Sequence, residues 1–347
     1  MNPLEWSLPV LSLLFACVAA VIAWFGIKMT HTARDLAHET GIGEALMGAL
    51  FIGASTSLSG ITTSVSAAAS GYPELAVSNG LGGIAAQTTF LAIADIAYRR
   101  ANLEHAAASA ENLFMSAFLI TLLGIHVLAM AIPEFTWFTI HPATLMLFGV
   151  YIFGIQLLAK THEMPMWLPR KTRDTPKEPA EHKNKGKKHL LRLWLRFIGY
   201  SAIVAGSGWA LAELAVPLID KSGLSHGIVG GVFTAVSTSI PELVVAVTAV
   251  RMGALNLAVG DIIGGNAFDT LFISVSDIAY TSGSIYSAIS STEVFWLSIS
   301  LVMTGILLMG LIYRQRHGPG NIGLESVALL LIYVVSVTFL TVDSLTA

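Results

Sequence analysis

Two stretches of the sequence, 182 residues apart, carry the same pattern. Residues 237–280 read STSIPELVVAVTAVRMGALNLAVGDIIGGNAFDTLFISVSDIAY, and residues 55–98 read STSLSGITTSVSAAASGYPELAVSNGLGGIAAQTTFLAIADIAY. Aligned without a gap, they are identical at 18 of 44 positions. Two unrelated apolar helices would not keep one register through two helices and a turn. The match between the two stretches therefore indicates an internal duplication, which makes the two halves of the chain structural repeats.

The composition places these repeats in a membrane. Of 347 residues, 54% are hydrophobic and only 12% are charged, against about 25% charged in an ordinary soluble domain. So little polar surface cannot cover a water-exposed globule, and most of the surface must face lipid. The single cysteine, Cys17, excludes an internal disulfide and a cysteine-based metal site. Nucleic-acid binding is not expected, because no basic face with aromatic residues is evident outside one loop.

The apolar stretches predict an all-α membrane protein with ten transmembrane helices. Each is long enough to cross a hydrocarbon core, which needs about 20 residues. Placing the N-terminus outside puts 18 of the 19 Lys and Arg residues in cytoplasmic segments and leaves only Lys221 outside, as the positive-inside rule requires. The predicted spans cover residues 8–27, 44–70, 74–98, 111–132, 139–159, 191–217, 226–251, 255–281, 290–313 and 321–343.

The spans divide the chain into two repeats of opposite orientation. We expect the first inverted repeat at residues 1–159, a cytoplasmic basic linker at 160–190 and the second inverted repeat at 191–347. Five spans precede the equivalent point of the second half, and because five is odd the repeats are inverted. The linker is rich in Lys, Glu, Pro and His, which is typical of a solvated, flexible segment. A regulatory role or contact with anionic lipid is the alternative for the linker.

Inverted repeats of this kind place a substrate site near the middle of the membrane, where paired helices are interrupted. The sequence provides residues for such breaks twice in each half, at 55–60 and 80–83, and at 237–241 and 260–265. Interrupted helices free backbone carbonyls, which can coordinate ions. The repeats therefore predict a site between the second, third, seventh and eighth spans.

Two carboxylates lie at the depth of these breaks. Glu242 and Asp269 are far from the ends of their predicted spans, and no Lys or Arg lies at comparable depth to pair with them. An unpaired carboxylate there is costly unless it binds a proton or a cation. Oxygen ligands of this kind suit Na⁺, Ca²⁺ or H⁺ better than soft metals. A protonated acid in a helix interface is the structural alternative.

Other polar residues are weaker candidates. Asp95 and Asp277 sit near span ends, and we interpret them as interface or capping residues. Asp261 is a candidate for a position behind the ion ligands or on the access path. The histidines near span ends show no ligand spacing and are expected to pack at interfaces; they are His126, His141 and His226.

The motif around the two carboxylates resembles the second α-repeat of the sodium/calcium exchanger (cation/Ca²⁺ antiporter) superfamily. Residues 238–243 read TSIPEL and residues 260–269 read GDIIGGNAFD. The superfamily pattern is roughly Gly-Thr-Ser-x-Pro-Glu, followed by Gly-Asn-x-x-Gly-Ser-Asn-x-x-Asn/Asp. The resemblance implies ten spans and alternating access, with the first two helices sliding across a rigid core. It also implies that Glu242, Asp269, Thr238 and Ser239 are cation ligands. From the first repeat, Thr56, Ser57 and Gln87 can offer neutral oxygens to the same site.

The first repeat departs from this pattern. Its register places Ser59 and Gly60 where the family has Pro and Glu, and Gln87 at the position that matches Asp269. All the charge of the expected cluster therefore comes from the second half. Two carboxylates balance one Ca²⁺ or two Na⁺, so a three-for-one sodium/calcium stoichiometry is not expected.

The resulting hypothesis is a secondary cation antiporter rather than an enzyme. It needs no cofactor, and its transported cations are Ca²⁺ and Na⁺ by resemblance. A Na⁺/H⁺ or K⁺/H⁺ exchanger and a transport-inactive relative are the alternatives. An aspartyl protease and a passive channel are less favoured. We expect a multi-pass protein of a bacterial inner (plasma) membrane, for which a monomer in the lipid bilayer suffices.

Overall fold

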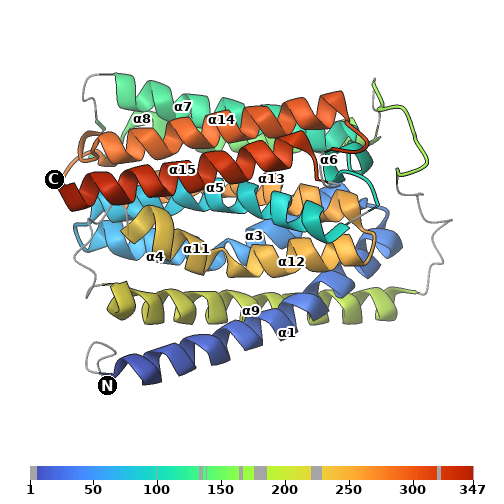
Figure 1. Cartoon of the computed structure of the whole chain (residues 1–347), viewed down its shortest axis with the longest axis horizontal. Helices are drawn as coiled ribbons and strands as arrows, with labels where there is room; N and C mark the ends of the chain where they lie inside the picture. Colours follow the sequence, from blue (N-terminus) through green and yellow to red (C-terminus); the bar gives the residue numbers. More distant parts are fainter. Residues whose placement is uncertain are drawn as a thin grey trace.

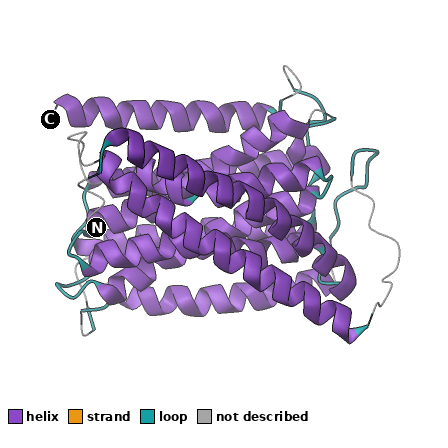
Figure 2. Cartoon of the chain, turned by 90° about the horizontal axis from the view of Figure 1, so that it is seen from below, coloured by secondary structure: helices purple, strands orange, loops and turns teal. Residues whose placement is uncertain are grey.

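The computed structural model describes residues 6–98, 100–132, 136–137, 139–163, 167–175, 186–219, 229–318 and 322–346. Within these ranges the chain is built from long helices that run roughly parallel or antiparallel to one another (Figures 1 and 2). The first half contains α1 (Leu8–Thr40), α2 (Glu44–Leu46), the π-helix η2 (Met47–Ile52), α3 (Gly53–Thr56), α4 (Leu58–Ala69), α5 (Pro73–Tyr98), α6 (Leu103–Ala106), α7 (Ala110–Ala131) and α8 (Pro142–Glu163). The second half contains α9 (Lys187–Ile219), the π-helix η3 (Val229–Thr234), α11 (Ala235–Thr238), α12 (Ile240–Arg251), α13 (Leu255–Ala279), the 3-10 helix η4 (Ile285–Ser287), α14 (Ser291–Tyr313) and α15 (Leu324–Thr346).

The helices are long and apolar enough for a multi-pass membrane protein. Among the described residues, seven single helices qualify as spans by length and composition, and two bent helix pairs raise that number to nine. The remaining position in the predicted order belongs to α9, which starts at the basic end of the linker. The ten-helix inverted repeat is consistent with this arrangement.

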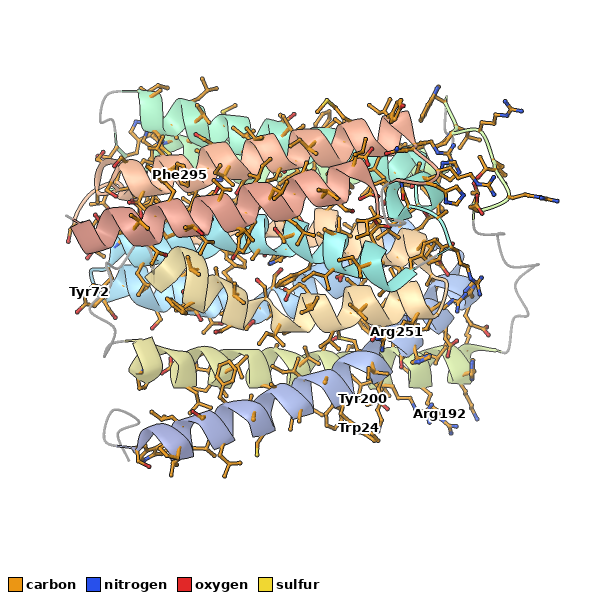
Figure 3. The ribbon with its side chains drawn as sticks, viewed as in Figure 1. Trp24, Tyr72, Arg192, Tyr200, Arg251 and Phe295 are labelled. Carbon is orange, nitrogen blue, oxygen red and sulfur yellow. The ribbon has the colours of Figure 1, made fainter. Side chains whose placement is uncertain are left out.

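The outward-facing side chains of the bundle are apolar, as a lipid-facing surface requires. Trp24 on α1, Leu195 on α9 and Phe339 on α15 are each about three-fifths exposed, at 61%, 61% and 58%. Figure 3 shows Arg192 and Arg251 toward the end of the bundle that carries the linker, and Tyr72 at the opposite end. We call these the linker end and the far end. The charge distribution predicts that the linker end is cytoplasmic.

The duplication is visible in the backbone. The π-helices η2 and η3 begin at Met47 and Val229, positions that are 182 residues apart like the sequence repeats. Each is followed by one turn of α-helix and a bend, at Ser57 in the first half and at Ser239 in the second. The bends measure 43° and 51°. π-Helices and bends of this kind interrupt the regular backbone hydrogen bonding, often at functional sites.

Two close helix crossings hold the bent segments against the central helices α5 and α13. At Gly82 on α5, an added Cβ would overlap the backbone of Gly231 in η3. At Gly264 on α13, it would overlap Ala49 in η2. Gly82 and Gly264 occupy equivalent positions in the two repeats, so each repeat uses a glycine to bring its central helix against the bent helix of the other. Small residues serve this purpose at membrane helix interfaces.

We therefore expect Gly264→Ala to destabilise the protein, because the methyl group meets backbone that cannot move aside. Overpacking of this kind costs about 1–3 kcal/mol or more. Thermal unfolding in detergent should show a clearly lower midpoint than the parent. Gly124→Ala is the matched control, since a Cβ there meets nothing within 4 Å. Equal midpoints for the two variants would contradict the close crossing.

The first helices of the two halves, α1 and α9, pair with each other along one side of the bundle (Figure 1). Ser201 on α9 donates to the sulfur of Met29 on α1 at 3.4 Å. The pair rests on the bent helices through small residues: Gly26 faces Val244 and Gly208 faces Ser59. The pairing joins the first helix of each half, whereas the sequence analysis expected the first two helices to move together.

Candidate cation-binding site

The two bends bring the expected ligands together in the interior. Ser57 ends the short helix α3 and Ser239 ends α11, so both serines stand where the helix changes direction. The bends also touch: the Ser59 hydroxyl donates to the carbonyl oxygen of Thr238 at 3.1 Å. Asp269 and Gln87 approach from the middle of α13 and α5. Four elements from both repeats thus converge on one point, as the sequence predicts.

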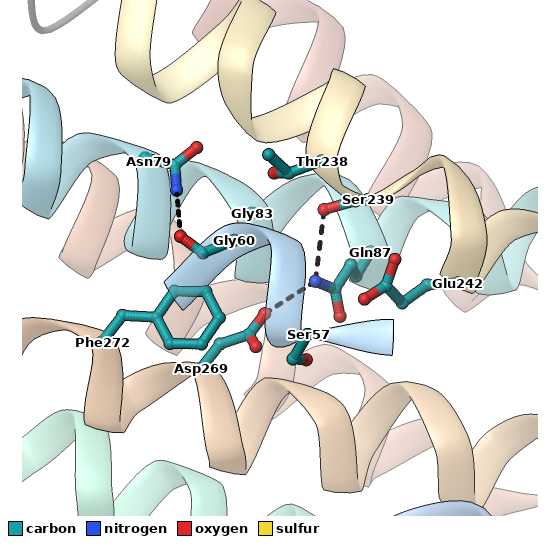
Figure 4. A pocket seen from close by; sticks show the side chains of 10 residues that line it. All are labelled: Ser57, Gly60, Asn79, Gly83, Gln87, Thr238, Ser239, Glu242, Asp269 and Phe272. Carbon is teal, nitrogen blue, oxygen red and sulfur yellow. Dashed lines mark hydrogen bonds between the residues drawn. The ribbon is translucent and has the colours of Figure 1, made fainter. Parts of the chain in front are cut away.

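A small, tightly lined cavity lies at this point (Figure 4). Its walls come from both repeats: Ser57, Gly60, Asn79, Gly83, Gln87, Thr238, Ser239, Glu242, Asp269 and Phe272. Six of the seven predicted ligands line the cavity. The seventh, Thr56, is fully buried one residue before Ser57 and does not line it.

The threonines at the bends bond back to their own helices. The Thr56 hydroxyl donates to the carbonyls of Ile52 and Gly53, and the Thr238 hydroxyl donates to those of Thr234 and Ala235. Their hydrogens are occupied in this way, so the oxygens keep lone pairs available as acceptors. For Thr238, which lines the cavity, this is the form of hydroxyl that a cation can use.

Gln87 connects the two halves across the cavity. Its Nε2 donates to Asp269 Oδ2 at 2.7 Å and to Ser239 Oγ at 3.2 Å (Figure 4). Gln87 and Asp269 are equivalent positions of the two repeats, so a glutamine amide replaces a second carboxylate there. The amide compensates part of the Asp269 charge and orients that side chain.

Several oxygens at the cavity have no hydrogen-bond partner among the described residues. They are Ser57 Oγ, Gln87 Oε1, Glu242 Oε2 and Asp269 Oδ1. Glu242 and Asp269 are each only 1% exposed. Buried polar atoms are normally paired, and each exception needs an explanation. Two carboxylate oxygens with a hydroxyl and an amide oxygen form a suitable ligand set for a hard cation such as Na⁺ or Ca²⁺.

The site lacks a third acid, and the structure shows what fills that place. Where the family pattern has a first-repeat glutamate, this chain has Gly60. A Cβ on Gly60 would lie 2.5 Å from Cε2 of the Phe272 ring. The aromatic ring therefore occupies the space into which a side chain at position 60 would extend. Among the described residues, no group of three or more His, Cys, Asp or Glu side chains is placed to hold a metal ion.

Asp261 is more deeply buried than the sequence suggested. It is fully buried on α13, and neither carboxylate oxygen has a partner among the described residues. Its equivalent in the first repeat is Asn79, whose amide donates to the Gly60 carbonyl at 3.2 Å and to Ser64 Oγ at 2.9 Å. A carboxylate cannot make those donations unless it carries a proton. The repeat register was the signal that could have singled out Asp261.

The acids near the span ends are caps, as predicted. Asp95 accepts from the backbone N–H groups of Leu103 and Gly323, and Asp277 accepts from those of Ile285 and His141. Two other predicted packing residues, His126 and His141, are buried against the Tyr286 ring. His226 lies outside the described residues.

Glu293 is one of the buried acids that the sequence did not single out. Glu293 on α14 is fully buried, accepts from the Ser78 hydroxyl at 2.6 Å and closes a capping box with Ser290. Ser290 and Glu293 stand three residues apart at the start of a predicted span, which is the sequence signature of such a box.

The comparisons with known proteins agree with this architecture. The family described as sodium/calcium exchanger protein matches residues 10–158 and 192–342. CaxA of Alkalimonas amylolytica, named as a candidate antiporter, is 25% identical over 306 residues, which cover 88% of this chain and 90% of that protein. The sodium/calcium exchanger MaX1 of Methanosarcina acetivorans is 29% identical over 119 residues, about a third (34%) of each chain.

Solved structures share the fold. NCX_Mj, described as a sodium-calcium exchanger, matches with a TM-score of 0.70 over 95% of this chain and 98% of that chain, at 15% sequence identity. The same exchanger soaked with 2.5 mM Na⁺ and 1 mM Sr²⁺ gives a TM-score of 0.71, also at 15% identity. At this identity the likeness establishes the fold.

The chain belongs to the sodium/calcium exchanger protein family. It is an integral, multi-pass membrane protein and a cation antiporter of the exchanger type, and the relatives it matches are exchangers and antiporters rather than enzymes.

Proposed function

We propose that the protein exchanges Na⁺ for Ca²⁺ by alternating access, with the cation held by Glu242 and Asp269. The observation that carries the proposal is the set of unpartnered, buried oxygens at the junction of the two bends. Neutral oxygens complete the coordination, from Ser57, Gln87, Thr238 and Ser239, with Thr56 behind them. The relative MaX1, a sodium/calcium exchanger, supports this assignment of ions.

The charge of the site supports a lower coupling ratio than three Na⁺ for one Ca²⁺. Glu242 and Asp269 are the two carboxylates that line the cavity. Their two negative charges balance one Ca²⁺ or two Na⁺, whereas a third Na⁺ would add uncompensated charge in a low-dielectric interior. We infer an exchange that moves no net charge.

The α1–α9 pair is the element best placed to move. It meets the bent helices α4 and α12 at two glycines, Gly26 and Gly208, which give close and smooth contact at those points. Nearer the linker end it also packs Trp194 against Phe51 of η2, a contact that sliding would have to rearrange. Movement along this face would open the cavity first to one side of the membrane and then to the other. The rest of the bundle, centred on α5 and α13, would stay rigid because its glycine crossings are in backbone contact.

Uptake of radioactive Ca²⁺ into sealed proteoliposomes tests the exchange. With outward gradients of Na⁺, K⁺ or H⁺ imposed in turn, we expect uptake only with the Na⁺ gradient. Liposomes without protein and proteoliposomes with equal Na⁺ on both sides are the controls. Uptake driven by no gradient, or equally by all three, would refute Na⁺/Ca²⁺ exchange.

The coupling ratio gives a separate prediction. In the same vesicles, a membrane potential set with K⁺ and valinomycin should leave the initial rate of Na⁺-driven Ca²⁺ uptake unchanged, because two Na⁺ carry the charge of one Ca²⁺. An uptake rate that differs between an interior-positive and an interior-negative membrane potential would show net charge movement and exclude the electroneutral ratio.

A second candidate function is exchange of a monovalent cation, Na⁺ or K⁺, for H⁺. The observation that favours it is the buried Asp261, whose two carboxylate oxygens have no hydrogen-bond partner among the described residues. Such a carboxyl group can take up and release a proton. A pH-sensitive dye trapped in the vesicles distinguishes the two, since only this alternative acidifies or alkalinises the interior when a Na⁺ or K⁺ gradient is imposed without Ca²⁺. Flux of neither kind would identify a transport-inactive relative.

The site is complete within one chain, which supports a monomer in the lipid bilayer as the working unit, with inorganic cations as its substrates. We place the protein in a bacterial inner (plasma) membrane. The inner membrane protein YrbG of Escherichia coli, 30% identical over 111 residues, supports that location.

A further inference from the structure

A second group of acids, two of them buried and one partly buried, lies at the linker end, away from the central cavity. It is formed by the end of α5, the short helix α6 and the start of α15, which lie near one another at that end of the bundle (Figure 1). The carboxylates come from Asp95, Glu104 and Glu325. We call these three side chains, with Asn102, the linker-end cluster. None of the four lines the cation cavity described above.

Comparison of the two repeats shows that Asp95 has a capping role that the other acids of this cluster do not share. Asp95 and Asp277 are equivalent, and each accepts from two backbone N–H groups at equivalent positions, 103 and 323 in one case and 285 and 141 in the other. This capping arrangement therefore exists at both ends of the molecule. Asp95 needs no ion to explain it.

Glu104 and Glu325 have no acidic counterpart at the other end. The register of 182 places Tyr286 opposite Glu104 and Ala143 opposite Glu325. At the far end the Tyr286 hydroxyl pairs with His126 Nδ1 at 3.1 Å. One end of the molecule is therefore neutral and aromatic at these positions, while the other carries two additional carboxylates. The capping role does not account for them.

These carboxylates converge on one glycine. A Cβ built on Gly323 would lie 2.9 Å from Glu325 Oε2, 3.1 Å from Glu104 Oε2 and 3.6 Å from Cγ of Asn102. Glu104 is only 2% exposed and Asn102 only 1% exposed. The two carboxylate oxygens and Asn102 Oδ1 have no hydrogen-bond partner among the described residues. Two unpartnered carboxylate oxygens thus lie beside the space next to the Gly323 Cα, and the Asn102 side chain borders the same space.

No positive side chain in the described part of the chain neutralises these acids. The nearby Arg314 donates to the carbonyls of His105 and Arg170, and Arg316 pairs with Asp174 at 2.7 Å. Burial, with the neighbouring carboxylates of Asp95 and Glu325, raises the pKa of Glu104 to about 8. The cluster is therefore electrostatically unfavourable as it stands, and a positive charge at its centre would relieve it.

We propose that Glu104, Glu325 and the Asn102 carbonyl oxygen form a second cation site that takes a hard divalent cation, with Ca²⁺ the probe of choice. Carboxylate and amide oxygens are the ligands such ions prefer, and two carboxylates balance the charge of one of them. The absence of a Cβ at Gly323 leaves the ion its space.

The position of the site suggests what it controls. Glu325 is in the first turn of α15 and Glu104 is in α6, so a bound ion ties the two elements together. On the outer side of α6, His105 contacts the linker at Thr172, with a separation of 3.0 Å between Nε2 and Oγ1. An ion at the cluster would therefore fix the helix that Thr172 of the linker contacts.

Equilibrium binding of radioactive Ca²⁺ to the full-length protein in detergent tests this site. The background is the variant Glu242→Gln/Asp269→Asn, which lacks the carboxylates of the central cavity. We expect this background to bind about one Ca²⁺ per chain at the second site. Adding Gly323→Ala should weaken that binding at least about tenfold, because the methyl group lies between the ligand oxygens while every charge is kept. Gly305→Ala is the matched control, since a Cβ there meets nothing within 4 Å.

A further variant, Glu104→Gln/Glu325→Gln in the same background, should abolish the binding. If it fails to fold, Gly323→Ala still decides. Absence of Ca²⁺ binding in the background, or binding that survives both Gly323→Ala and the double glutamine variant, would overturn the second site and leave Glu104 as a protonated buried acid. The proposal does not depend on the transport function. If the parent shows no Na⁺-driven Ca²⁺ uptake but the background variant still binds Ca²⁺, only the proposed exchange is contradicted.

Discussion

Glu242→Gln should abolish Na⁺-driven Ca²⁺ uptake while leaving the protein folded. The substitution keeps the shape of the side chain and removes half of the negative charge at the cavity, where Glu242 Oε2 is buried without a partner. Removing one member of a desolvated charge pair costs about 3–5 kcal/mol, and every 1.4 kcal/mol corresponds to a tenfold change in affinity. We therefore expect transport and Ca²⁺ affinity to fall by a factor on the order of 100 or more.

The readout separates a transport defect from a folding defect. In the absence of Ca²⁺ and Na⁺, the variant should unfold at the same temperature as the parent or higher, because an uncompensated buried charge has been removed. On adding Ca²⁺, the unfolding temperature should rise more in the parent than in the variant, because the variant keeps only the proposed second site. Glu74→Gln is the control, because Glu74 stands in the first turn of α5 at the far end and does not line the cavity. Near-normal uptake by Glu242→Gln would mean that Glu242 is not a cation ligand.

Much of this site follows from the sequence because the duplication constrains it. Once residues 55–98 and 237–280 are aligned, the register fixes which positions share a face and which break the helices. The π-helices and the bends fall at equivalent positions for this reason. Glu242 and Asp269 stand out because a charge deep in an apolar span is unfavourable without a partner. Local sequence and the membrane environment together determine these features.

Other features depend on contacts between distant segments, which a single sequence does not reveal. The Phe272 ring against Gly60, the unpartnered carboxylate of Asp261 and the convergence of Glu104 and Glu325 on Gly323 are of this kind. Glu104 lies in a short segment between spans, where an acid is normally solvated, and its burial depends on distant segments of the chain, among them Ser326 of α15, whose hydroxyl donates to Glu104 Oε1. Much of the linker lies outside the described residues, so the prediction that it is flexible stays a prediction.

The missing first-repeat acid leads to the second large expected effect. Gly60→Glu alone should give no gain in Ca²⁺ affinity and should destabilise the protein, since its Cβ would lie 2.5 Å from the Phe272 ring. Phe272→Ala alone should also destabilise it, by about 3–5 kcal/mol, because it leaves a cavity. Combined, the glutamate fills the vacated space and places a third carboxylate at the central site.

The double variant Gly60→Glu/Phe272→Ala should therefore be more stable than the sum of the single effects allows, and it should bind Ca²⁺ at least about tenfold more tightly than the parent, because affinity rises with ligand charge. Thermal unfolding of the parent, the two single variants and the double variant gives the coupling free energy between positions 60 and 272. For residues in contact it is expected at about 0.5–3 kcal/mol. Gly60→Gln/Phe272→Ala is the matched control, with the same shape and no added charge. If the glutamate and glutamine variants bind Ca²⁺ equally, position 60 does not face the ion, and the reduced charge of this exchanger has another structural origin.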